Sequence, residues 1–206
     1  MKYLYANGCS WTHYGPRPWP SFLGEKLSVE VINDSKGGGS NDRIFRTTTN
    51  FLVENQDILN ELIVVIGFTW PTRLEYLEYT EDGPKYKNVT WENEKALWPY
   101  YLWNESTIDS NHPRDPYFKK LSKNIIINLH KHLLELDIPH LFFFIPYDIR
   151  SSSTWSEKEL NYLNMQNFIF DVCFEELKID QVSDKDTHPG IKSHEKMANY
   201  IYEIIK

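Results

Sequence analysis

The sequence predicts a single α/β domain in which helices cover a parallel β-sheet. Strand-like and helix-like segments alternate along the chain, an order typical of βαβ units. The strongest strand candidate, Glu61–Ile66, is apolar at every position after Glu61, as expected of a strand buried on both faces. The length of 206 residues suits one domain, so residues 1–206 are treated as a single unit.

Local patterns in the N-terminal half predict the first elements. Lys2–Ala6 (KYLYA) forms a short strand that ends at an Asn-Gly turn, and Val29–Ile32 (VEVI) is a second, β-branched strand. Trp19–Leu27 is long enough for one or two helical turns. Asn41–Asn55 is expected to be a helix because its apolar residues form two pairs, Ile44–Phe45 and Phe51–Leu52, about two helical turns apart. Glu61–Ile66 is the third strand.

The C-terminal half continues the alternation. A leucine-rich stripe with four-residue spacing predicts a long helix over Tyr117–Leu136, and the apolar run Ile138–Ile145 predicts the next strand. Glu157–Leu177 has broad apolar faces and is expected to be helical. Ile179–Val182 is expected to be a last short strand, and Ile191–Ile205 a terminal amphipathic helix.

Composition excludes several classes of protein. Apolar residues make up 41% of the chain and charged residues 25%, which is ordinary for a folded protein and argues against disorder. The net charge of −7 makes nucleic-acid binding unexpected. Cys9 and Cys173 cannot build a disulfide framework or a zinc cluster. With neither a signal peptide nor a membrane-spanning run visible, we expect a cytoplasmic protein without membrane contact.

Two loops at the ends of the first two strands carry candidate functional residues. Ser10 follows the first strand directly, so its hydroxyl is expected at the sheet edge; the alternative is that Ser10 only caps the next helix. The second loop, Lys36–Arg43, contains three consecutive glycines that allow close backbone approach and present N–H groups to an anion. Its alternative interpretation is a flexible turn in which Ser40 caps a helix.

A third segment, Asp184–Gly190 (DKDTHPG), places carboxylates close to His188 on a short, stiff loop. A catalytic histidine needs a carboxylate partner that fixes its tautomer and stabilises its cation. In this segment Asp186 precedes His188 by two residues and Asp184 by four, so either acid is a candidate partner.

Together, and in this order, the three segments resemble the SGNH/GDSL hydrolases over nearly the whole chain. The resemblance implies a flavodoxin-like, three-layer α/β/α sandwich. It implies Ser10 as nucleophile, His188 as general base and then acid, and Asp186 as the partner that orients His188. The backbone N–H groups of Ser10 and Gly38 would then stabilise the oxyanion, and preorganised donors of this kind contribute about 3–4 kcal/mol each. No metal or organic cofactor is implied.

The sequence departs from the family pattern at two places. The third block of the family ends in Gly-x-Asn-Asp, whereas here Thr69 stands where the asparagine would be, with Asn41 as a possible substitute donor. The last block of the family is Asp-x-x-His, whereas here Lys185 occupies the position three before His188. Cys9 is a rival nucleophile, although a cysteine at a strand end is more often buried and inert.

Residues 76–118 form an insert that carries ten aromatic side chains. Flat rings with polar tips suit stacking on sugars, and the alternatives are a satellite core or an oligomer contact. Arg73, just before the insert, is expected to bind a substrate carboxylate or phosphate, or to pair with Glu75 or Glu78.

We therefore predict an esterase that hydrolyses a small acyl ester, such as an acetyl group, on a small molecule or glycan. One alternative is a catalytically degenerate binding or structural module, motivated by Thr69. The other is a thioesterase or lipase for longer acyl chains, which a dry aliphatic channel beside Ser10 would favour.

Overall fold

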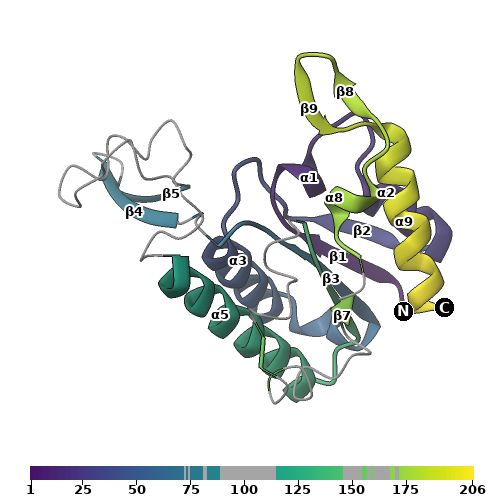
Figure 1. Cartoon of the computed structure of the whole chain (residues 1–206). Coiled ribbons are helices and arrows are strands. Elements are labelled where there is room, and N and C mark those ends of the chain that lie inside the picture. The colour runs from purple at the N-terminus through teal and green to yellow at the C-terminus, as the bar shows by residue number, and fades with distance from the viewer. Residues whose placement is uncertain are drawn as a thin grey trace.

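The fold is described from a computed structural model (Figure 1). It describes residues 1–71, 73, 75–80, 83–88, 115–145, 155, 156, 159, 168, 169 and 172–206.

A five-stranded parallel sheet forms the centre of the molecule. Its strand order is β2-β1-β3-β6-β7. The strands are β1 (Tyr3–Asn7), β2 (Glu30–Asn33), β3 (Leu62–Phe68), β6 (His140–Phe144) and β7 (Phe168–Ile169). Strand β1 pairs with β2 on one side and with β3 on the other, where Asn7 lies opposite Ile66. The ends of β1, β2 and β3 therefore meet at one edge of the sheet, where ligands of parallel α/β folds bind.

Helices cover both faces of the sheet, which makes the three-layer sandwich that the sequence predicted (Figure 1). One layer contains α3 (Asn41–Glu54) and α5 (Asp115–Glu135), and the other contains α2 (Trp19–Leu27) and α9 (Ile191–Ile205). Alternate strand residues face opposite layers, because side chains in a strand alternate between the two faces. The α3/α5 core includes Tyr5, Val64, Ile66, Phe142, Ile44, Leu52, Leu129 and Leu133. The α2/α9 core includes Leu4, Ala6, Val65, Phe143, Trp19, Leu23, Met197 and Ile201.

Short elements complete the described part of the chain. They are α1 (Ser10–His13), the 3-10 helix η1 (Gln56–Glu61), α8 (Phe174–Leu177), and the hairpins β4–β5 and β8–β9. Strand β4 spans Glu75–Thr80 and β5 spans Gly83–Asn88, so part of the predicted insert is an antiparallel hairpin. Residues 89–114, with half of the insert's aromatic residues, lie outside the described residues.

Two predicted elements are wrong. The expected helix Glu157–Leu177 contains strand β7, which pairs with β6 through Phe168 and Ile169, before the single turn of α8 begins at Phe174. The expected last strand, Ile179–Val182, does not join the main sheet. Instead, β8 (Gln181–Ser183) pairs antiparallel with β9 (Asp186–Pro189), and this hairpin carries His188.

Candidate active site

Ser10 lies at the end of β1, where the chain turns directly into helix α1. The N-cap of α1 is Cys9, in extended conformation, and Ser10 is the first helical residue. The interpretation of Ser10 as the helix cap is therefore wrong. Ser10 is only 6% exposed, so its hydroxyl is more enclosed than the sequence suggested. Cys9 is fully buried in the α2/α9 core, which argues against the rival nucleophile.

The glycine loop packs directly on the Ser10 loop. The Lys36 N–H donates to the Gly8 carbonyl at 3.2 Å, and a Cβ atom on Gly39 would lie 3.0 Å from that same oxygen. Gly38 has a left-handed φ of 70°, which glycine adopts without the strain a Cβ would bring. The Ser40 side chain accepts from Arg43 N at 3.4 Å, so Ser40 does cap α3, as one interpretation predicted. The loop thus brings Gly38 beside the nucleophile turn and also starts a helix.

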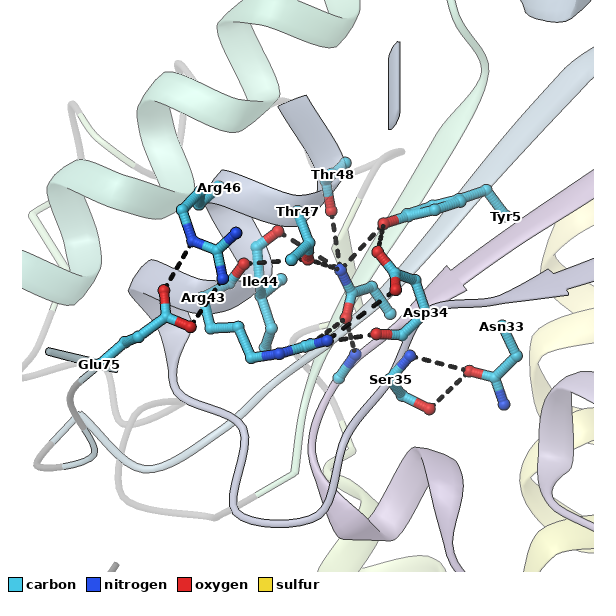
Figure 2. Close-up of polar contacts among 12 residues, drawn as sticks. Tyr5, Asn33, Asp34, Ser35, Arg43, Ile44, Arg46, Thr47, Thr48 and Glu75 are labelled. Carbon is cyan, nitrogen blue, oxygen red and sulfur yellow. Dashed lines mark hydrogen bonds and ion pairs between the residues drawn. The ribbon is translucent and has the colours of Figure 1, made fainter. Parts of the chain in front are cut away.

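A buried polar network centred on Asn7 lies beneath the Ser10 loop. Figure 2 shows the partners Tyr5, Thr47 and Thr48 around it. Asn7 Oδ1 accepts from the Gly8 N–H at 2.8 Å, while Asn7 Nδ2 lies 2.8 Å from Thr47 Oγ1 and 3.1 Å from Thr48 Oγ1. Tyr5 Oη is 3.0 Å from the same nitrogen, and burial raises the pKa of the Tyr5 hydroxyl. The network joins β1 to α3 and fixes the backbone that leads into Ser10.

Arg43 and Asp34 extend this network toward the end of β2. Arg43 is 8% exposed, and its Nη1 donates to the Asp34 carbonyl at 3.0 Å (Figure 2). The Asp34 carboxylate accepts from Tyr5 Oη at 3.0 Å. Sequence reasoning missed these residues, because Asn7 was read only as part of an Asn-Gly turn.

His188 and Asp186 form the pair that the sequence predicted. His188 Nδ1 lies 2.6 Å from Asp186 Oδ1, and the His188 backbone N–H donates to the same oxygen at 3.0 Å. These two hydrogen bonds, the backbone one first, hold the pKa of the Asp186 carboxyl below its usual value. A carboxylate at Nδ1 selects the tautomer whose Nε2 is free to accept a proton. Asp184, the other candidate acid, is exposed.

The spacing of this pair follows from its place in strand β9. Residues two apart in a strand face the same side, so Asp186 and His188 lie next to each other without a loop between them. The Tyr14 ring packs on the His188 ring with centroids 4.8 Å apart. Helix α1 contacts β9, which places the His188 hairpin beside the short helix that begins at Ser10. In the described residues no hydrogen bond joins Ser10 Oγ to His188, and such bonds often form fully only once a substrate is bound.

Asn41 holds the end of β3 and is not free to serve as an oxyanion donor. Its Oδ1 accepts from the Thr69 N–H at 2.9 Å, and its Nδ2 donates to the Thr69 carbonyl at 3.0 Å and to Ser122 Oγ at 3.1 Å. Both amide hydrogens are therefore engaged, and Asn41 is almost fully buried. We correct the expectation that Asn41 replaces the missing asparagine; its role is to position Thr69.

Thr69 and Arg73 form a second pair at this edge. Thr69 is fully buried, and its Oγ1 accepts from Arg73 Nη1 at 3.0 Å. The Arg73 guanidinium carbon lies 4.5 Å from the centre of the Trp70 ring. The expected pairing of Arg73 with Glu75 is wrong, because Glu75 binds Arg46 through two contacts of 2.7 Å (Figure 2). The side chain of Glu78 lies outside the described residues.

No family model and no curated protein matches this chain. Solved structures do match it over nearly its whole length. One, from Desulfitobacterium hafniense DCB-2, is titled a lipolytic protein of the G-D-S-L family; it has a TM-score of 0.54 and 15% identity, and the match covers 99% of each chain. The esterase EstA from Pseudoalteromonas sp., inhibited by monoethylphosphonate, has a TM-score of 0.55 and 13% identity over 100% of this chain and 97% of its own.

A third structure, TesA, has a TM-score of 0.55 and 10% identity, with coverage of 100% of this chain and 98% of its own. At such low identity the likeness concerns the fold: the chain has the α/β fold of SGNH and GDSL hydrolases. Within the described residues, no helix combines the length and apolar character needed to cross a bilayer.

Proposed function

We propose that this chain, which shares the fold of SGNH and GDSL hydrolases, is a serine esterase of that family. The observation that carries the proposal is the Asp186–His188 pair, with its 2.6 Å contact, on a hairpin beside the helix that begins at Ser10. The fold alone does not specify a reaction, so the proposal depends on these three residues. The similar structures, which include an esterase and a lipolytic protein of the G-D-S-L family, agree with it.

The proposed reaction begins when Ser10 Oγ attacks the ester carbonyl and His188 Nε2 takes the hydroxyl proton. Asp186 holds the imidazole in the reactive tautomer and stabilises its cation. The tetrahedral intermediate collapses as His188 returns the proton to the departing alcohol. Water then attacks the acyl enzyme by the same route, which releases the acid and restores Ser10.

The N–H groups of Ser10 and Gly38 are the proposed oxyanion donors. The Ser10 N–H belongs to the first turn of α1, where backbone N–H groups lack partners within the helix. Gly38 lies in the loop that packs on Gly8 and Cys9, and its N–H has no acceptor among the described residues. Thr69, buried and already bound to Arg73, is not needed as a third donor in this arrangement.

The finer substrate assignment is a small acyl group, such as acetyl, and a carbohydrate alcohol. The enclosed Ser10 hydroxyl supports a small acyl group, because a long chain needs a wide apolar channel. The carbohydrate assignment depends on the aromatic insert, whose side chains lie outside the described residues. Trp11 and Trp70, whose ring centroids are 6.2 Å apart beside Ser10, add aromatic surface of the same kind.

A second candidate function is a catalytically degenerate binding module. The observation that favours it is that Ser10 is 6% exposed and, within the described part of the chain, makes no hydrogen bond to His188. This candidate predicts a folded protein that binds ligands at the sheet edge without turnover.

Hydrolysis of 4-nitrophenyl acetate tests the proposed function. We expect saturable turnover by the wild type and loss of at least about 1,000-fold in kcat for Ser10→Ala, since the nucleophile acts as a unit with its base. Cys9→Ala is the matched control: it removes the thiol of the rival nucleophile and should retain turnover. Equal rates for wild type and Ser10→Ala, with both proteins folded, would reject the esterase and favour the binding module.

A further inference from the structure

Arg73 stands apart from the other arginines that the structure describes. Arg17 pairs with Glu25, Arg43 with Asp34 at 3.9 Å, and Arg46 with Glu75 at 2.7 Å. For Arg73, no carboxylate partner is recorded in the described part of the chain. Among the described residues its guanidinium makes one side-chain hydrogen bond, to the neutral Thr69 hydroxyl. Within that part of the chain, the remaining N–H donors of this permanent cation are available to a ligand.

The guanidinium is nevertheless held in place. Nη1 of Arg73 is 3.0 Å from Thr69 Oγ1, and the guanidinium carbon Cζ lies 4.5 Å from the centre of the Trp70 ring. The Arg73 backbone N–H donates to the Trp70 carbonyl at 3.2 Å. The Thr69 backbone is itself held by the Asn41 side chain, whose amide accepts from the Thr69 N–H and donates to the Thr69 carbonyl. A side chain ordered in advance loses less conformational entropy when it binds a ligand.

The sheet places Arg73 at the same edge as Ser10. Asn7 and Ile66 are opposite each other on neighbouring parallel strands, and Ser10 and Thr69 each follow three residues later. Trp11, next to Ser10, packs edge-on against Trp70, and Arg73 lies over that same Trp70 ring. Arg73 therefore borders the Ser10 site from the β3 side.

We propose that Arg73 binds a carboxylate carried by the ester substrate, so that the enzyme selects anionic esters over neutral ones. This inference rests on the proposed esterase function. An arginine fork matches the two oxygens of a carboxylate, and stacking on an aromatic ring keeps the fork planar and oriented.

The test compares two substrates with the same leaving group. 4-Nitrophenyl acetate is neutral in its acyl part, whereas mono-4-nitrophenyl succinate carries a carboxylate. We expect wild type to prefer the succinate ester, and Arg73→Gln to lower the ratio of the two kcat/KM values by about 10- to 100-fold. Arg73→Lys keeps the positive charge but loses the planar fork. Its ratio of the two kcat/KM values should therefore lie between those of wild type and Arg73→Gln.

Lys131→Gln is the control for net charge, because Lys131 is an exposed residue of α5 that pairs with Glu135. It should leave the selectivity ratio within about twofold of wild type, since exposed ion pairs contribute little. An unchanged ratio in Arg73→Gln would overturn the inference. If the rates with both substrates fell equally, Arg73 would be an oxyanion donor and the inference would again be wrong.

Calorimetry separates this inference from the esterase proposal. Succinate is titrated into Ser10→Ala protein and into the double variant Ser10→Ala/Arg73→Gln, neither of which requires turnover. Binding that disappears with Arg73→Gln supports the carboxylate site even if no ester is hydrolysed. Turnover by wild type, combined with no succinate binding and no preference between esters, would leave the esterase standing and reject the carboxylate site.

Discussion

Asn7 is the residue whose removal tests the buried network most sharply. Its side chain is fully buried and is the point where β1, α3 and the Ser10 loop are joined by hydrogen bonds. In Asn7→Ala the amide disappears while its neighbours stay buried. We expect the variant to be less stable and to lose activity beyond what its loss of stability explains.

The magnitude follows from the contacts. The amide has two N–H groups and one carbonyl, and its short contacts are to Thr47 at 2.8 Å, Tyr5 at 3.0 Å and the Gly8 N–H at 2.8 Å. At about 1 kcal/mol for each hydrogen bond, plus the cost of leaving buried groups unpaired, the loss is about 3–4 kcal/mol. Domains of this size have an unfolding free energy of about 5–15 kcal/mol, so the change is large but survivable.

The assay is urea unfolding followed by tryptophan fluorescence, with Asn50→Ala as control. Asn50 is an exposed residue of α3, in the same helix as the partners of Asn7. We expect the control to change the unfolding free energy by less than about 0.5 kcal/mol. A loss below about 1 kcal/mol for Asn7→Ala, or a loss equal to that of Asn50→Ala, would show that the network does not hold the loop.

Three further predictions concern single side chains. Asp186→Asn should lower kcat by about 100- to 10,000-fold, because the amide no longer selects the reactive tautomer of His188, whereas Asp184→Asn should be nearly neutral in steady-state kinetics. Burial lowers the pKa of His194 to about 4 from its ordinary 6.5, so the unfolded chain takes up a proton first as pH falls. The contribution of His194 to the unfolding free energy, roughly 3 kcal/mol, is present above pH 6.5 and is lost between about pH 6.5 and 4. When chemical unfolding is measured at several pH values, His194→Gln should show a smaller loss of unfolding free energy over this range. Ser40→Ala should cost about 1 kcal/mol in the unfolding free energy, because it removes the cap of α3.

The fold was largely predictable because its central elements have strong local signals. Strand β3 is apolar at all its positions, and α9 is strongly amphipathic, so each could be placed from its own residues. Strand β7 could not, because a two-residue strand within an apolar stretch has no period of its own. The β8–β9 hairpin was missed because β9 ends at Pro189, directly before Gly190, and a Pro-Gly pair is more typical of loops than of strands.

The candidate site was predictable where its residues are close in sequence. Asp186 and His188 are two residues apart, so their pairing needed only a strand to bring them together. The Asn7 network joins residues about forty positions apart, and only the packing of α3 on β1 brings them into contact. The prediction of Asn41 as an oxyanion donor is wrong for the same reason: its actual partner, Thr69, is distant in sequence.

Labelling with a fluorophosphonate, followed by mass mapping of the modified residue, tests whether Ser10 is an activated nucleophile. EstA, which shares this fold, is inhibited by a phosphonate. We predict stoichiometric modification of wild type at Ser10, none in Ser10→Ala, and much slower modification in Asp186→Asn. A folded wild type that is not labelled, or one that is labelled at another residue, would contradict the assignment of Ser10 as an activated nucleophile.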